Sequence, residues 1–259
     1  MTALCSFLFK TVTIAEMEAR KLRHDPTDLL TRAVQPALWL LVFGQVFTRS
    51  RAIPTGDLPY IDFLAPGVLA QSVLFIAIFY GIAVIWERDL GIIHKFLASP
   101  TPRAALVLGK ALSAGVRSTA QAVIVFAIAL ALGVGVNWNP LALLGVLAMV
   151  ILGAALFSTF SLIIACLVKT RERFMGIGQV LTMPLFFASS AIYPISMMPH
   201  WLQAIARVNP LTYEVDGLRA MMLSGGSSHY GLAVDFAVVI AVTAVLVAIA
   251  GRLYPSVAT

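Results

Sequence analysis

The sequence contains little charge and very little cysteine, and both scarcities narrow the class of protein. Charged residues make up 12% of the 259 positions, and hydrophobic residues make up 60%. Ordinary soluble proteins carry roughly 25% charged and about 45–50% apolar residues. With a mean hydropathy of +0.93, the chain is predicted to be surrounded by lipid. These values exclude a disordered, a collagen-like or a disulfide-rich protein.

Residues that carry catalysis or bind metals are also scarce. The two cysteines and four histidines are too scattered for a disulfide or a metal site. Acidic pairs at 16/18, 87/89 and 214/216 are spaced two apart, which splays their side chains on a helix. No acid is assigned to the interior of a span, which weakens a proton-coupled transporter, because proton relays need such an acid. We therefore expect no catalytic residue, no metal and no cofactor bound by this chain.

Two short segments resemble nucleotide-binding motifs but depart from them. Gly109 and Lys110 are followed by Ala111, and the glycine that a phosphate-binding loop needs at position 104 is absent. The peptide from Leu223 to Ser227 mimics a signature peptide of ATPases, yet it falls on the predicted outer side. We interpret it as a helix end capped by glycine. The chain is therefore not expected to be an enzyme or to bind ATP.

Long charge-free runs predict six membrane-spanning helices. The run 63–86 has 24 residues, which span about 36 Å as a helix, and the hydrocarbon core is about 30 Å thick. The run 118–168 is divided by Gly133, Gly135 and Pro140, which favour a turn. We predict an all-α membrane protein with one domain over 1–259, an N-terminal interfacial helix in 1–30, and spans at about 31–48, 63–86, 112–133, 140–168, 174–196 and 232–253.

The distribution of Lys and Arg predicts the orientation. With the N-terminus inside, 14 of these residues lie in inner segments and 4 in outer segments. The positive-inside rule then places both termini in the cytoplasm of a multi-pass protein of the cell membrane, and we expect a prokaryotic one. The net charge is +6, and the positively charged residues are spread along the cytoplasmic side without forming a patch. We therefore expect them to contact membrane lipid and not nucleic acid.

Three segments combine polar and apolar residues in informative patterns. The inner segment 86–103 predicts a short amphipathic helix, which is either a lipid-interface helix or a docking surface. Lys110, Ala114, Arg117 and Gln121 share one helix face, and snorkelling of Arg117 to the interface is favoured over its lining a cavity. The segment 199–223 is interrupted by prolines and predicts two outer helices that re-enter or lie on the membrane.

The order of these segments resembles the permeases of ABC type-2 exporters. The stretches WERDLG…SPTPRAALVLGKALSAGVRSTAQ and YPISMMPHWLQAIARVNPLTYEVDGLR are most similar to the drug- and antibiotic-resistance branch, which includes daunorubicin-type permeases. The resemblance implies a homodimer bound to two copies of a separate cytoplasmic ATPase, which holds ATP and Mg. It implies that this permease exports a hydrophobic or amphipathic, drug-like solute.

The resemblance also assigns roles to residues of this sequence. Contacts with the ATPase would come from Trp86, Glu87, Arg88, Asp89, Leu90, Phe96, Pro100, Pro102 and Arg103. An outer gate would be formed by Asn209, Pro210, Thr212 and Tyr213. For the substrate path, mixed aromatic and polar surfaces suggest Phe79, Arg117, Gln121, Phe186, Phe187 and Tyr193, although helix packing explains them as well.

Other functions remain open at this point. Exporters of polysaccharides or lipid-linked saccharides share the architecture that the resemblance implies. A secondary transporter or channel, or a lipid-modifying membrane enzyme, would need neither an ATPase nor a docking surface. Small residues such as Gly81, Gly145 and Gly153 allow close helix contacts, either between two copies or within one chain.

Overall fold

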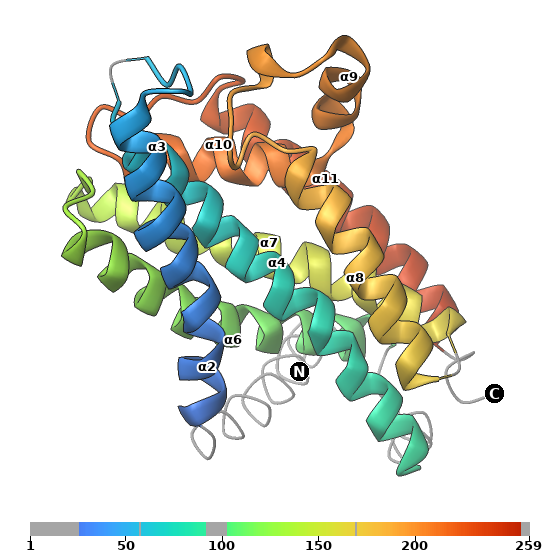
Figure 1. Ribbon diagram of the computed structural model, residues 1–259. Coiled ribbons are helices and arrows are strands. Elements are labelled where there is room, and N and C mark those ends of the chain that lie inside the picture. Colours follow the sequence, from blue (N-terminus) through green and yellow to red (C-terminus); the bar gives the residue numbers. More distant parts are fainter. Residues whose placement is uncertain (1–25, 57, 92–102, 169, 255–259) are drawn as a thin grey trace.

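The computed structural model describes residues 26–56, 58–91, 103–168 and 170–254, and this part of the chain is helical without a strand. Figure 1 shows the helices as one bundle, which confirms the predicted all-α class. The elements are α2 (Pro26–Leu38), η1 (Trp39–Gly44), α3 (Gln45–Ser50), α4 (Tyr60–Asp89), α6 (Arg103–Ala131), α7 (Pro140–Leu167), α8 (Arg171–Phe187), η2 (Ile195–Met197), α9 (His200–Val208), α10 (Pro210–Met222) and α11 (Leu232–Leu253).

Four of these helices, α4, α6, α7 and α11, are long and apolar enough to cross a membrane. They contain the predicted spans 63–86 and 232–253 completely, and all but the last one or two residues of 112–133 and 140–168. The predicted span 31–48 corresponds to α2, the π-helical η1 and α3, which follow one another without a break. Most of the predicted interfacial helix, residues 1–25, lies outside the described residues.

The predicted span 174–196 is wrong at its end, because α8 stops at Phe187. The last carbonyl groups of α8 are bound by side chains instead of by a further helical turn. The Ser189 hydroxyl donates to Phe186 O at 2.7 Å, and the Asn209 amide donates to Leu185 O and Ala188 O at 2.7 and 3.0 Å. These bonds satisfy the free carbonyls of a helix end, and the chain then folds back toward α4.

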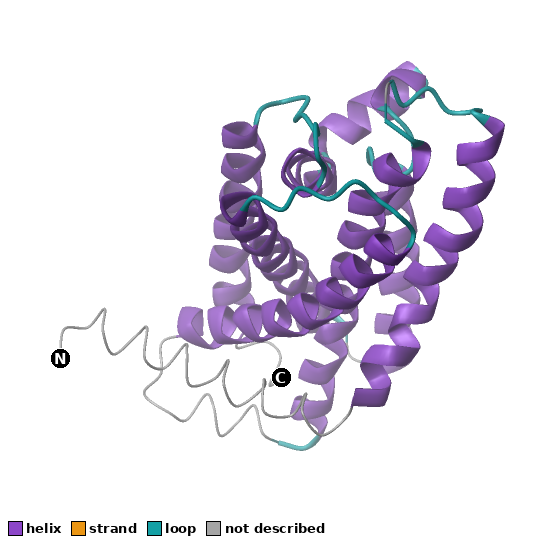
Figure 2. Ribbon diagram, turned by 90° about the vertical axis from the view of Figure 1, so that its left-hand side faces the viewer, coloured by secondary structure: helices purple, strands orange, loops and turns teal. Residues whose placement is uncertain are grey.

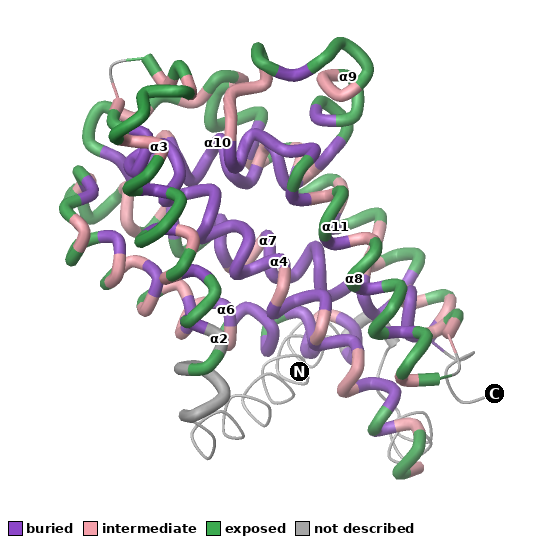
Figure 3. Tube along the Cα trace, in the orientation of Figure 1, coloured by how far each residue is buried: buried purple, intermediate pink, exposed green. Residues whose placement is uncertain are grey.

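Helix α4 lies at the centre of the bundle and packs against α6, α7, α8 and α10. Figure 3 shows buried positions along α4 and α10, whereas exposed positions cover the outer faces of α8 and α11. Close packing depends on small residues: a Cβ at Gly81 would collide with Ser161, one at Gly145 with Met221, and one at Gly153 with Glu214. These glycines therefore serve contacts within one chain.

The connections gather at two ends of the bundle, and most of the loops drawn in Figure 2 lie at one of them. We call the end with Arg51, α9 and the start of α11 the upper end, and the end with Asp89 and Arg171 the lower end, as in Figure 1. At the upper end, Gly135 N donates to Asp62 Oδ2 at 3.3 Å, and Asn137 N donates to Met222 O at 2.9 Å. The α6–α7 loop is thereby attached to both α4 and α10.

Candidate functional site

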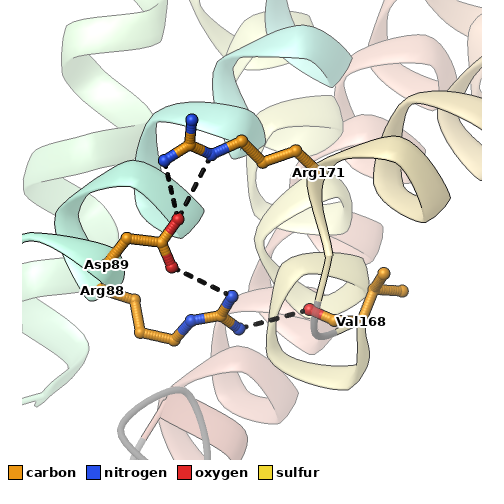
Figure 4. A network of polar contacts seen from close by, with 4 residues as sticks. All are labelled: Arg88, Asp89, Val168 and Arg171. Carbon is orange, nitrogen blue, oxygen red and sulfur yellow. Dashed lines mark hydrogen bonds and ion pairs between the residues drawn. The ribbon is translucent and has the colours of Figure 1, made fainter.

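A polar network joins three helices at the lower end. Arg171, at the start of α8, donates from Nε and Nη2 to Asp89 Oδ2 at 3.2 and 2.8 Å. Arg88 donates to Asp89 Oδ1 at 3.3 Å and to the carbonyl of Val168, next to the end of α7, at 3.5 Å. Figure 4 shows Asp89 between the two guanidinium groups. The last turn of α4 is thus held to α7 and α8 by charge-assisted bonds.

Glu87 takes part in a different, buried ion pair. Its Oε2 accepts a bond of 2.5 Å from Lys110 Nζ, and the two side chains are 11% and 7% exposed. The pair joins α4 to α6 from the same last turn of α4 that carries Arg88 and Asp89. Removing one partner of such a pair leaves an uncompensated buried charge, at a cost of about 3–5 kcal/mol. Glu87 therefore links α4 to α6, and its carboxylate is turned away from the surface on which we expect a contact with the ATPase.

Trp86 and Leu90 are two exposed apolar residues at the lower end. They are 50% and 69% exposed, and the Trp86 ring lies 4.1 Å from the guanidinium carbon of Arg171. This cation–π contact fixes the indole beside the ionic network. Of the other predicted ATPase-contacting residues, Phe96, Pro100 and Pro102 lie outside the described residues. Arg103 begins α6, which places it at the same end of the bundle.

The polar face predicted on α6 is turned toward α4. Lys110 binds Glu87, Ala114 is fully buried, and Arg117 places its guanidinium carbon 5.5 Å from the centre of the Tyr80 ring. Arg117 is half-buried. The guanidinium group thus contacts α4, and its snorkelling to the membrane interface stays a prediction. Gln121, one turn further along, is 1% exposed.

Gln121 and Phe79 line the same cavity, although they come from different helices. The cavity has a volume of about 320 Å³ and lies between α2, α4 and α6. Gln35 contributes from α2, and Gln71 and Phe75 from α4. Sequence reasoning missed Gln35 and Gln71. Their positions in the sequence could have indicated this site, because Gln71 interrupts an otherwise apolar run and Gln35 lies at the start of another.

The remaining substrate-path candidates do not join this cavity. Phe186 is 1% exposed and packs edge-on against Trp39 of η1, with ring centres 5.7 Å apart. Phe187 is 43% exposed on the outer face of the helix. Tyr193 donates its hydroxyl to Phe187 O at 2.6 Å and so closes its own loop. The structure thus divides the six candidates: two share a cavity, and Phe186 serves helix packing.

The predicted outer gate is a compact junction between α9 and α10. Asn209 is 5% exposed, and its Oδ1 accepts from Leu211 N at 3.0 Å, which caps α10 just before Pro210. Its amide nitrogen binds the end of α8, as described above. Thr212 is fully buried. Tyr213 donates to Arg207 O at 2.7 Å, so α8, α9 and α10 meet at this junction.

Helix α10 is buried on all sides between α4, α7 and α11. This favours the re-entrant form of the prediction over a helix lying flat on the membrane. Arg219 lies 3.8 Å over the Phe63 ring and donates to Ser190 O at 2.7 Å. Asp216 accepts from the backbone N–H groups of His229 and Tyr230 at 2.7 and 3.0 Å. The charges of α10 therefore hold it in place.

The expectation that no acid lies inside a span needs correction, because acids are buried among the helices. Asp235, in the first turn of α11, is fully buried and accepts from the Ser228 hydroxyl at 2.7 Å. Glu214 of α10 is 1% exposed, and neither carboxylate oxygen has a hydrogen-bond partner. Burial raises the pKa of Glu214 well above its usual value. The spacing of charges along the sequence did not reveal these buried acids, because the packing of the helices places them beside apolar segments.

Metal-binding geometry is not found in the part of the chain that the structure describes. No group of three or more His, Cys, Asp or Glu side chains converges there. The polar groups that do converge belong to the lower network, the cavity between α2, α4 and α6, and the junction at Asn209. Together with the apolar outer helices, these features define a helical membrane protein with a partly open cavity of mixed polar and apolar lining and a hydrogen-bonded junction at each end.

Comparison with known proteins identifies the family. A family model described as ABC-2 type transporter matches residues 8–223, which is most of the chain. The chain therefore belongs to the ABC-2 type transporter family, whose relatives are named as transport permeases. It is a membrane-embedded permease and not the ATP-hydrolysing subunit of an ABC transporter. The resemblance found in the sequence is confirmed.

Three relatives show the range of similarity. A protein named transport permease ycf38 from Cyanophora paradoxa is 30% identical over 205 residues, 77% of this chain and 69% of the relative. The daunorubicin resistance ABC transporter permease DrrB1 of Streptomyces coeruleorubidus is 24% identical over 232 residues, 90% and 81% of the two chains. YbhR of Escherichia coli, named as a multidrug ABC transporter permease, is 31% identical over 173 residues, 66% and 46%.

Proposed function

We propose that the chain is the membrane subunit of an exporter driven by a separate cytoplasmic ATPase, which binds ATP and Mg²⁺. Family membership supports this proposal, and the lower end of the bundle carries it. There, exposed Trp86 and Leu90 lie beside a network that joins α4, α7 and α8. A partner that binds this surface could therefore move several helices at once. We further propose a homodimer with two copies of the ATPase.

The proposed coupling can be tested at Trp86. Trp86→Ala should lower substrate-stimulated ATPase activity and transport severalfold when the permease is reconstituted with its ATPase. The matched control is Trp138→Ala, because Trp138 is also exposed, at 66%, but lies at the upper end. The control should keep wild-type activity. Equal loss in both variants, or no loss in Trp86→Ala, would place the docking surface elsewhere.

The direction of export requires the upper end to face outward, as the distribution of Lys and Arg predicts. Arg51 lies at the upper end, and Arg103 and Arg171 lie at the lower end. Single cysteines placed at these positions in a cysteine-free variant should react with a membrane-impermeant reagent only at 51 in intact cells. Positions 103 and 171 should react only after permeabilisation. Labelling of 51 and 103 from the same side would refute the proposed topology.

The transported solute is proposed to be hydrophobic or amphipathic. DrrB1 is named for daunorubicin resistance, and the cavity between α2, α4 and α6 combines aromatic rings with amide groups. The junction at Asn209 would close the outer exit, because it bonds α10 to the end of α8. ATP-dependent transport into inside-out vesicles, measured over a panel of such solutes, tests this assignment. Transport by the permease without ATPase, driven by an ion gradient, would contradict it.

A further inference from the structure

The cavity between α2, α4 and α6 has one wall made of amide groups. Gln121 of α6 and Gln71 of α4 line it and are 1% and 3% exposed. Both Nε2 and Oε1 of Gln121 are buried and make no hydrogen bond. An amide carries two N–H donors and one acceptor oxygen, and leaving such groups unpaired in a protein interior costs free energy. A ligand that offers both an acceptor and a donor would satisfy them.

The apolar part of the cavity lining lies on α4, one and two turns after Gln71. Phe75 and Phe79 line the same cavity, with their rings nearly parallel at 27° and their centres 6.2 Å apart. Both are half-buried, so part of each ring is free for contact. Aromatic side chains in this position favour a planar ring, which can stack against them in an offset or edge-on arrangement. The volume of about 320 Å³ is within the range of ligand pockets.

Charge is missing from the cavity lining. None of the described side chains that line it is acidic or basic. On α6 the neighbouring charge is Arg117, one turn from Gln121, and it is directed to the Tyr80 ring. A cationic ligand would lose its hydration without gaining a counter-charge and would meet this guanidinium nearby. An uncharged ligand avoids both penalties.

We propose that this cavity binds an uncharged, planar aromatic group that carries an amide or a similar donor–acceptor pair. The proposal rests on the exporter function and names the chemical class of its solute. The amide of the ligand pairs with Gln121, its ring lies against Phe75 and Phe79, and Gln71 completes the polar wall. Cationic aromatic compounds of the same size are selected against.

The test is equilibrium binding to the full-length permease in lipid nanodiscs, without ATPase. Three probes share one ring system: 2-naphthamide, naphthalene and 2-naphthylmethylammonium. We expect 2-naphthamide to bind most tightly, after subtraction of the signal from empty nanodiscs. Gln121→Leu should weaken 2-naphthamide binding about tenfold, the equivalent of one lost hydrogen bond, and leave naphthalene binding unchanged. Gln45→Leu is the control, because Gln45 is an exposed glutamine on neighbouring α3.

Several results would overturn the proposal. They are equal binding of 2-naphthamide and naphthalene, tightest binding of the ammonium probe, and an unchanged affinity in Gln121→Leu. Folding of Gln121→Leu is judged by its elution as a single species. If the variant fails this criterion, Gln71→Leu replaces it, with the same expected loss of affinity and the same refuting result. ATP-dependent transport is measured separately with the ATPase present. If the permease binds 2-naphthamide selectively but does not transport it, the proposed exporter function is refuted and the proposed binding site is not. If transport occurs without selective binding at the cavity, only the proposed binding site is refuted.

Discussion

Replacing Asn209 by Asp tests the upper junction with a change of one functional group. The acceptor that caps α10 through Leu211 N is retained, and acidic residues are favourable at a helix start. What is lost is the amide nitrogen, which donates to Leu185 O and Ala188 O at 2.7 and 3.0 Å. The new carboxylate would instead face two carbonyl oxygens inside a site where Asn209 is only 5% exposed.

The magnitude follows from these two bonds. Each intramolecular hydrogen bond contributes about 0.5–1.5 kcal/mol net, and a buried acceptor left unpaired costs about 1–3 kcal/mol. Because the end of α8 can move partly toward water, we expect Asn209→Asp to lower the free energy of unfolding by about 2–4 kcal/mol. For a chain of this size such a loss lowers the midpoint of thermal unfolding by roughly 4–16 °C.

The chain contains a matched control in the same sequence context. Asn139 also precedes a proline and caps a helix, since its Oδ1 accepts from Leu141 N at 3.0 Å, but this bond lies at an exposed position. Asn139→Asp should therefore keep the wild-type unfolding midpoint. Thermal unfolding in detergent, followed by loss of the monodisperse elution peak, measures both variants. If Asn209→Asp unfolds together with wild type and Asn139→Asp, the amide bonds do not hold the junction.

Two further substitutions test contacts inside the bundle. Glu87→Lys should impair folding or uncouple ATP hydrolysis from transport more strongly than Glu87→Ala, because it places two buried cations together. The double exchange of Glu87→Lys with Lys110→Glu should restore activity. No gain of activity from the double exchange would show that the ion pair is unimportant. Gly153→Ala should destabilise the protein by about 1–3 kcal/mol through overpacking, since the new Cβ would lie 2.6 Å or less from the Glu214 carboxyl atoms. Addition of Glu214→Ala should relieve this loss, and Gly251→Ala, which has open space around it, should be neutral; equal unfolding midpoints for all of these glycine variants would refute the collision.

Local sequence signals predicted both ends of α7 and α11 to within one residue. The predicted spans 63–86 and 112–133 begin three and nine residues after α4 and α6 do. The asparagine–proline pairs at 139–140 and 209–210 start α7 and α10, because the asparagine caps the helix and the proline fits its first turn. Charge-free runs identified the long apolar helices, since length and composition are properties of a segment alone. The end of α8 could not be predicted, because the groups that terminate it come from Ser189 and from distant Asn209.

The partners of the polar side chains were decided by the tertiary structure. The sequence placed Glu87 and Lys110 on separate segments, and only the packing of α4 against α6 makes them a buried pair. The same packing brings Gln121 and Phe79 to one cavity and separates them from Phe186. In a membrane, lipid and protein interior are similarly apolar, so an apolar helix face does not reveal which neighbour it meets. Sequence therefore determined which segments are helical and some of their ends, and side-chain fit between helices determined the end of α8 and the site.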